Sequence, residues 1–224
     1  MALILSIETA TTNCSVALSN NGETLVLKED YNTSYSHAER LHVYIEEVLK
    51  AGNIKPSDLD AIAISKGPGS YTGLRIGVSA AKGLCFALDL PLISIPTLES
   101  LANQSTSGDG YVVPMLDARR MEVYAAVFAS DHKQLRETKA EILEEQSFLD
   151  YLEKDKVYFI GDGIEKSKTF IKHANAYFID GKLPSANEMG RIAFEKYEKS
   201  DIEDVAYFEP FYLKDFVALK SKKN

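Results

Sequence analysis

The feature of this 224-residue sequence that most constrains its fold is an order of secondary-structure elements that is predicted twice. In each half, the hydrophobic periodicity predicts three strands, then a helix, a strand, a helix, a strand and a last helix. Three successive strands pair as an antiparallel meander, and the alternating strands and helices that follow extend it as a mixed sheet. The sequence therefore predicts an α/β fold of two similar domains, each with a mixed sheet flanked by helices.

The first half contains clear signals for its turns and helix ends. Residues 20–22 are Asn-Asn-Gly, which favours the left-handed backbone of a tight hairpin. Gly52 caps the first helix at its C-terminal end, and Pro91 interrupts the chain before the last strand. The predicted strands are residues 3–8, 14–19, 23–29, 61–65 and 92–95, and the predicted helices are residues 34–51, 74–88 and a short segment that follows Pro96.

A change in composition separates the two halves. Residues 103–110 are Asn-Gln-Ser-Thr-Ser-Gly-Asp-Gly, which is typical of a loop. We therefore predict two domains, one of residues 1–104 and one of residues 105–224. In the second domain the predicted strands are residues 111–116, 122–128, 134–140, 157–160 and 176–179, and the predicted helices are residues 147–153, 166–172 and 185–198.

The charge and the cysteines exclude several classes of protein. The 25 Lys and Arg against 33 Asp and Glu give a net charge of −8, which disfavours a surface that binds nucleic acid broadly but allows a local basic patch. Cys14 and Cys85 are too few for a disulfide framework or a zinc site. Glu8 interrupts the N-terminal apolar run, and no apolar stretch reaches the ~18 residues of a membrane helix. We predict a cytoplasmic protein.

A glycine-rich segment lies between a predicted strand and the second long helix. Gly67, Gly69 and Gly73 alternate there with Ser70 and Thr72, an arrangement in which backbone amides can bind a phosphate. The spacing matches neither the dinucleotide fingerprint nor the P-loop. Two interpretations therefore stand, a phosphate-binding loop and a tight structural turn, and the residues favour the turn.

Three further positions have both a functional and a structural interpretation. Glu8 ends the first strand, where a carboxylate could bind magnesium in an ATPase cleft or could simply terminate the strand. Gly161, in Gly161-Asp-Gly163, suits either a turn or a nucleotide contact. For Asp117-Ala-Arg-Arg120 we favour a polar turn with an ion pair over a functional motif. No metal site is predicted, because His37 and His42 are five residues apart and diverge on a helix.

The second long helix is predicted to have two apolar faces. One face packs on the sheet, and the other carries the small or apolar residues Ile76, Ala80, Gly83 and Ala87. Small residues at this spacing allow another helix to approach closely. Because both faces must be buried, the helix lies either inside its own domain or at a subunit interface, and we favour the interface.

Several motifs spread along the chain resemble the TsaB (YeaZ) family. The resemblance extends over essentially the whole chain and is densest in residues 61–128. The motifs are Ile4-Leu-Ser-Ile-Glu-Thr-Ala-Thr11, Gly67-Pro-Gly-Ser-Tyr-Thr-Gly-Leu-Arg-Ile-Gly77, Pro96-Thr-Leu-Glu-Ser-Leu101, Asp117-Ala-Arg-Arg120 with Glu122-Val-Tyr124, and Pro210-Phe-Tyr-Leu213.

The resemblance implies a fold and a role. The fold is the actin-like ATPase fold of two RNase H-like domains. The role is in forming threonylcarbamoyladenosine beside the anticodon of tRNAs that read codons beginning with A. In this family the transfer is made by the metal-dependent paralogue TsaD, which TsaB binds and activates, and the ATPase TsaE joins them. Residues 102–107 contain no histidine where TsaD carries its metal-binding pair, so the resemblance implies a non-catalytic partner.

The resemblance also implies which surface binds TsaD. It assigns the contact to the first two helices, here Leu41 and Ile45 together with the face of Ile76, Ala80, Gly83 and Ala87. Alone, the chain would bury this surface in a homodimer, and it would meet tRNA only through the complex. No cofactor is expected, except ATP or ADP held at a subunit interface. The alternative is a small ATP-using phosphotransferase of the actin-like superfamily, with Glu8, the glycine-rich segment and residues 161–163 as its cleft.

Overall fold

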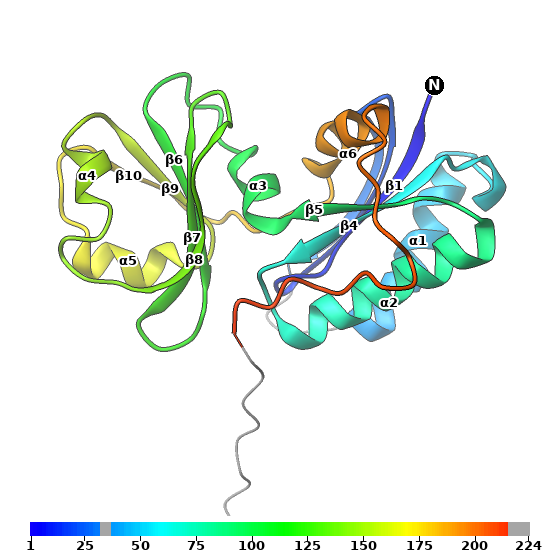
Figure 1. The fold of residues 1–224 in the computed structure, drawn as a ribbon, viewed down its shortest axis with the longest axis horizontal. Coiled ribbons are helices and arrows are strands. Elements are labelled where there is room, and N and C mark those ends of the chain that lie inside the picture. The colour runs from blue at the N-terminus through cyan, green and yellow to red at the C-terminus, as the bar shows by residue number, and fades with distance from the viewer. Residues whose placement is uncertain (32–36, 215–224) are drawn as a thin grey trace, which may run out of the picture.

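The computed structural model describes residues 1–31 and 37–214, which form two lobes side by side (Figure 1). The first lobe contains a five-stranded sheet in the order β3-β2-β1-β4-β5. Its first three strands form an antiparallel meander, and β4 and β5 run parallel to β1. The strands are β1 (Leu3–Glu8), β2 (Asn13–Asn20), β3 (Glu23–Tyr31), β4 (Ala61–Gly67) and β5 (Leu92–Pro96).

The second lobe repeats this arrangement. Its sheet order is β10-β9-β6-β7-β8, so the first of its strands is again central, with the antiparallel pair on one side and the parallel pair on the other. The duplication confirms the predicted fold of two RNase H-like domains. The strands are β6 (Tyr111–Asp117), β7 (Glu122–Ala129), β8 (Gln134–Ile142), β9 (Val157–Ile160) and β10 (Ala176–Ile179).

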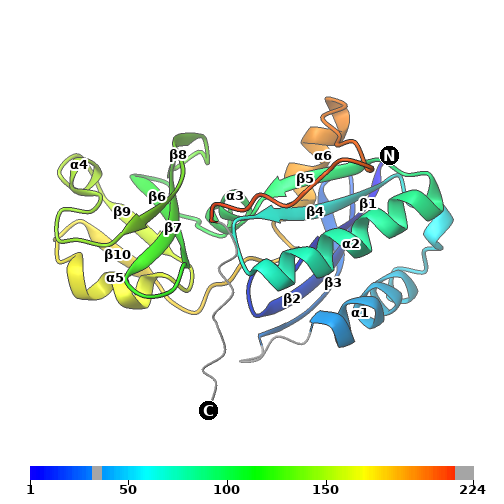
Figure 2. The same ribbon diagram turned by 60° about the horizontal axis from the view of Figure 1, so that its bottom comes forward.

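Two long helices cover one face of the first sheet, and Figure 2 shows them on the side opposite α6. They are α1 (His37–Ala51) and α2 (Tyr71–Leu88), and a short 3-10 turn, η1 (Pro56–Asp58), precedes β4. Strand residues alternate between the two faces, so Leu5 and Ile7 pack under α1 and α2 while Ile4 faces the other way. The predicted start of the first helix at Ser34 lies outside the described residues.

The last helix of each half covers the sheet of the other lobe. Helix α3 (Thr97–Ala102) follows β5 but packs on the second sheet, where Leu98 and Leu101 meet Phe128. Helix α6 (Met189–Glu198) follows β10 but packs on the first sheet, where Met189 and Ile192 belong to the core that contains Ile4. The other helices of the second lobe, α4 (Leu149–Leu152) and α5 (Ile164–Phe170), stay on their own sheet.

This exchange corrects the predicted domain limits. Residues 105–224 do not form one unit, because α6 contributes to the core of the first lobe. The hydrophobic pattern of α6 identifies an apolar face, but the pattern is the same whichever sheet covers it.

The chain then returns across the first lobe as a strap, residues 201–214 (red in Figure 1). The amide of Glu203 donates to the carbonyl of Leu92, and the Nζ of Lys82 on α2 donates to two strap carbonyls at 3.1 and 3.0 Å. At its end, Lys214 forms an ion pair with Glu122 of the second lobe. Within the described residues, every helix is too short or too polar to cross a bilayer.

Candidate functional site

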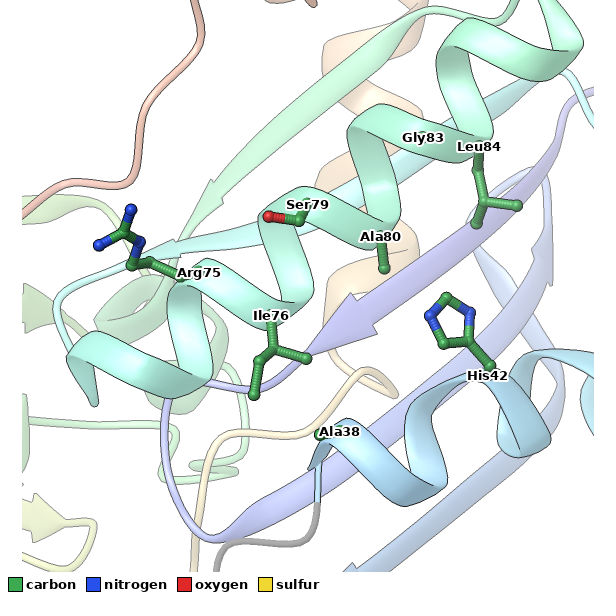
Figure 3. A pocket seen from close by; sticks show the side chains of 8 residues that line it. All are labelled: Ala38, His42, Arg75, Ile76, Ser79, Ala80, Gly83 and Leu84. Atoms are coloured by element: carbon green, nitrogen blue, oxygen red, sulfur yellow. The ribbon is translucent and has the colours of Figure 1, made fainter.

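An open groove of 580 Å³ runs between α1 and α2 on the surface of the first lobe. Figure 3 shows Ile76, Ala80 and Leu84 of α2 pointing toward Ala38 and His42 of α1. Arg75, Ser79 and Gly83 complete the lining. The groove is therefore a mainly apolar hollow between two helices, with polar groups at its edge.

Helix α2 buries one face and exposes the other, as its sequence predicts. Leu74, Val78 and Ala81 lie in the core, whereas Gly83 and Ala87 are exposed. A Cβ atom built on Gly83 would have no heavy atom within 4 Å, so the space above this position is open. Ile76 and Ala80, the other two residues of the predicted face, are half-buried, and a partner that covers this face stays a prediction.

Two residues predicted for the interface lie in the core instead. The side chain of Leu41 is 0% exposed, and that of Ile45, also on α1, is buried in the same core against the first sheet. The residues of α1 that reach the groove are Ala38 and His42. The prediction was wrong here because helical spacing shows which residues share a face, but it does not show which face turns toward α2.

Two large apolar side chains that sequence reasoning missed extend the exposed surface. Phe86 on α2 is 87% exposed, and Val43 on α1 is about half exposed. Phe86 precedes Ala87 of the predicted face, and Val43 follows His42 of the groove. Their signal in the sequence is an apolar residue at a position outside the buried stripe of its helix.

The glycine-rich segment is packed tightly against the connection between β1 and β2. A Cβ on Gly69 would lie 2.5 Å from the carbonyl oxygen of Ala10, and one on Gly73 would lie 2.2 Å from that of Thr9. The amide of Ser70 donates to the Ala10 carbonyl at 2.6 Å. These close approaches fit the interpretation as a structural turn, which the sequence favours.

The segment is also shorter than predicted, because α2 begins at Tyr71 rather than at Leu74. The hydroxyl of Ser70 accepts a hydrogen bond from the Gly73 amide and caps the helix, and Thr72 lies in the first turn. Gly67 has a left-handed φ of +111°, and a Cβ there would lie 2.6 Å from the carbonyl oxygen of Phe211 in the strap. A phosphate contact by these residues stays a prediction.

Glu8 is fully buried at the end of β1. Its Oε1 accepts a hydrogen bond of 2.6 Å from the amide of Ala10, and its Oε2 has no hydrogen-bond partner. Burial raises the pKa of this carboxyl to about 7, against hydrogen bonds that lower it. The carboxyl therefore sits beneath the glycine-rich segment rather than on an open surface.

Gly161 lies in the other lobe, at the end of β9. It also has a left-handed φ of +111°, and a Cβ there would lie 2.2 Å from the carbonyl oxygen of Met115. The structure thus brings Gly69 and Gly73 against the loop that follows Glu8 and Gly67 against the strap, but it places Gly161 apart from them. Gly161 lines a second hollow of 340 Å³ with Ile164, Glu165, Gly181, Lys182 and Leu183.

Asp117-Ala-Arg-Arg120 forms the hairpin connection between β6 and β7. The Nζ of Lys166 on α5 forms an ion pair with Asp117 at 2.8 Å. The predicted polar turn and an ion pair are therefore present, and a function of the same residues stays a prediction. Among the described residues, no group of three His, Cys, Asp or Glu side chains is placed to hold a metal ion.

Comparisons with known proteins agree with the resemblance seen in the sequence. The family model of TsaD, tRNA N6-adenosine threonylcarbamoyltransferase, matches residues 31–221. The tRNA threonylcarbamoyladenosine biosynthesis protein TsaB of Escherichia coli is 33% identical over 97% of this chain and 96% of its own length. TsaB of Bacillus subtilis is 31% identical over 94% of this chain and 93% of its own length.

A solved structure has the same architecture over nearly all of the chain. It is described as a protein from Pseudomonas aeruginosa with similarity to peptidase YEAZ. It superposes with a TM-score of 0.83 and 25% identity, and the match covers 96% of this chain and 100% of the other.

Proposed function

This chain belongs to the TsaB (YeaZ) family, and on that premise we propose that it acts in forming threonylcarbamoyladenosine in tRNA as the non-catalytic partner of a TsaD transferase. The partner would bind at the groove between α1 and α2. The observation that carries this proposal is the open space above Gly83, on a helix whose opposite face is buried.

The shape of the groove suits a helix of the partner. Helices pack at distances of about 8–10 Å, and the shortest distances need small residues at the contact. Ala80 and Gly83 provide them at the centre of the exposed face, and Ile76 provides an apolar side chain beside them. Phe86 would gain most from being covered, because burial of such a side chain stabilises a contact by about 1.5–3 kcal/mol.

The proposal assigns no chemical step to this chain. The family's transfer reaction belongs to TsaD, and residues 102–107 of this chain contain no histidine to replace its metal ligands. TsaE would join the pair, tRNA would be bound by the assembly, and the chain alone would form a homodimer through the same surface. Any ATP or ADP would be held only at a subunit interface.

The proposal is tested by light scattering on a sizing column, with the chain alone and mixed with TsaD of the same organism. We expect a homodimer that exchanges into a one-to-one heterodimer. Gly83→Leu should abolish the exchange, because its side chain fills the space that the partner helix needs. The variant should remain folded, since leucine favours a helix more than glycine by up to about 1 kcal/mol.

The matched control is Lys199→Leu, which adds an exposed leucine next to α6 and should pair normally. Co-elution of Gly83→Leu with TsaD would show that the interface is elsewhere. A wild-type chain that does not pair with TsaD would contradict the function itself.

A further inference from the structure

Two neighbouring arginines differ from all the others in the chain. Arg40 and Arg136 form ion pairs with Asp30 and Glu141, and Arg75 and Arg191 donate to Tyr71 and Asn103 at 2.7 Å. Within the described residues, the guanidinium groups of Arg119 and Arg120 make no hydrogen bond or ion pair, and both residues are exposed. Two unpaired positive charges therefore lie side by side on a chain whose net charge is −8.

The backbone that presents them is unusual. Arg119 and Arg120 have φ angles of 69° and 52°, so two consecutive residues with large side chains adopt the left-handed conformation. Glycine or asparagine would adopt it more easily. A turn that served only to connect β6 to β7 would not need arginine at either position.

The surrounding residues hold this backbone in place. The ammonium group of Lys166 donates to Asp117 Oδ1 at 2.8 Å and to the carbonyls of Arg120 and Glu122 at 2.8 and 2.9 Å. The amide of Arg119 donates to the same Asp117 oxygen at 2.6 Å. All three donors of a mostly buried lysine thus fix the conformation of one turn.

The nearby carboxylates do not neutralise the arginines. Asp117 pairs with Lys166, and Glu122 pairs with Lys214 at the end of the strap. Asp162, a third carboxyl group beside the turn, accepts a hydrogen bond of 2.8 Å from the amide of Asp117. Within the described residues, none of these carboxylates forms an ion pair with Arg119 or Arg120.

We propose that the turn of Arg119 and Arg120 is a phosphate contact for RNA, which, given the proposed function, is the tRNA of the assembly. Guanidinium groups match the geometry of phosphate oxygens and bind them in a bidentate manner. Because the chain as a whole repels RNA, any direct contact must be a local basic patch. The turn belongs to the second lobe, and none of its residues lines the α1–α2 groove that we propose for TsaD.

The test measures the affinity of an unmodified tRNA transcript for the chain alone and for its complex with TsaD, over a series of salt concentrations. For Arg119→Gln/Arg120→Gln we expect the affinity at about 0.1 M salt to fall about tenfold or more. The slope of log affinity against log salt should shrink by about 1 to 2, since up to two phosphate contacts are lost.

Two further variants separate this contact from general effects. Arg191→Gln/Lys199→Gln removes the same charge from exposed positions of the first lobe and should leave affinity and slope unchanged. Arg119→Gly/Arg120→Gly suits the left-handed backbone, so the turn stays folded, and it should lose affinity as the glutamine variant does.

Three results would overturn the inference. One is wild-type affinity and slope in both arginine variants. Another is an equal loss in the control, since binding would then follow net charge. The third is a lost contact with TsaD while the chain alone keeps its RNA affinity, which would make the turn a protein contact. If the wild-type chain does not co-elute with TsaD, the proposed function fails instead, and the titration of the chain alone still tests the arginines.

Discussion

The two ends of α2 use glycine for opposite purposes. At the N-terminal end, Gly73 and Gly77 are buried, and Cβ atoms there would lie 2.2 Å from oxygens of Thr9. Near the C-terminal end, Gly83 is exposed, with nothing within 4 Å of a Cβ. At each end, the lack of a side chain lets a neighbour approach the helix backbone closely. At Gly73 and Gly77 the neighbour is Thr9 of the same chain, whereas at Gly83 it is the proposed partner.

The comparison is tested most directly by making the same substitution at both ends. Gly77→Leu should destabilise the chain by about 3 kcal/mol or more, because Thr9 and Ile64 leave no room for the side chain. Gly83→Leu should leave stability unchanged or raise it slightly. Urea unfolding of the two variants measures the difference, and equal stability would show that the buried end tolerates larger residues.

Glu8 should make the buried end sensitive to pH. Its pKa is about 7 in the folded chain and 4.5 when unfolded, so the folded state holds the proton more tightly. The free energy of unfolding should therefore fall as pH rises from about 4.5 to 7, by about 3 kcal/mol in total. Glu8→Gln should abolish this fall and be the more stable protein at pH 8. Parallel pH profiles for the two proteins would contradict the assignment.

The strap tests a third contact of α2. Lys82→Met keeps the aliphatic stem but loses the hydrogen bonds to the carbonyls of Ala206 and Phe208. We expect a loss of about 1 kcal/mol in stability and faster proteolysis within residues 201–214. Lys50→Met, at an exposed position on α1, is the control. An unchanged cleavage rate would mean that other contacts hold the strap.

The smallest effect is expected where glycine is absent from a position that suits it. Arg120→Gly should stabilise the chain by about 0.5 kcal/mol, because relief of the left-handed backbone outweighs the added freedom of the unfolded chain. Thermal unfolding measures this effect against Arg191→Gly, which places glycine in α6 and should destabilise it. A destabilised Arg120→Gly would show that the arginine side chain supports the turn.

Much of the fold could be predicted because its signals are local. The turn at Asn20-Asn21-Gly22 and the apolar run of residues 3–8 place strands without reference to the rest of the chain. That Ile76, Ala80, Gly83 and Ala87 share a face of α2 that is not fully buried was also readable from helical spacing alone. Leu41 and Ile45 were misassigned because helical spacing shows which residues share a face of α1. It does not show whether that face turns toward the core or toward the solvent.

The candidate site was only partly predictable, because it depends on contacts between distant segments. The strap meets the glycine-rich segment through Phe211 and Gly67, which are far apart in the sequence. The constraint on Arg119 and Arg120 comes from Lys166, on a different element. The sequence identified Asp117-Ala-Arg-Arg120 as a polar turn, but nothing local showed that its arginines would stay unpaired.

By itself the sequence determined the element order, the two mixed sheets, the family and the small-residue face of α2. These follow from local periodicity and short motifs, which are independent of the rest of the structure. Only the tertiary structure decided that α3 and α6 exchange sheets. It also decided that Thr9 and Ala10 occupy the space beside Gly69 and Gly73, and that the space above Gly83 is open. Each of these depends on which surfaces meet, and an apolar face stabilises any packing that excludes water from it.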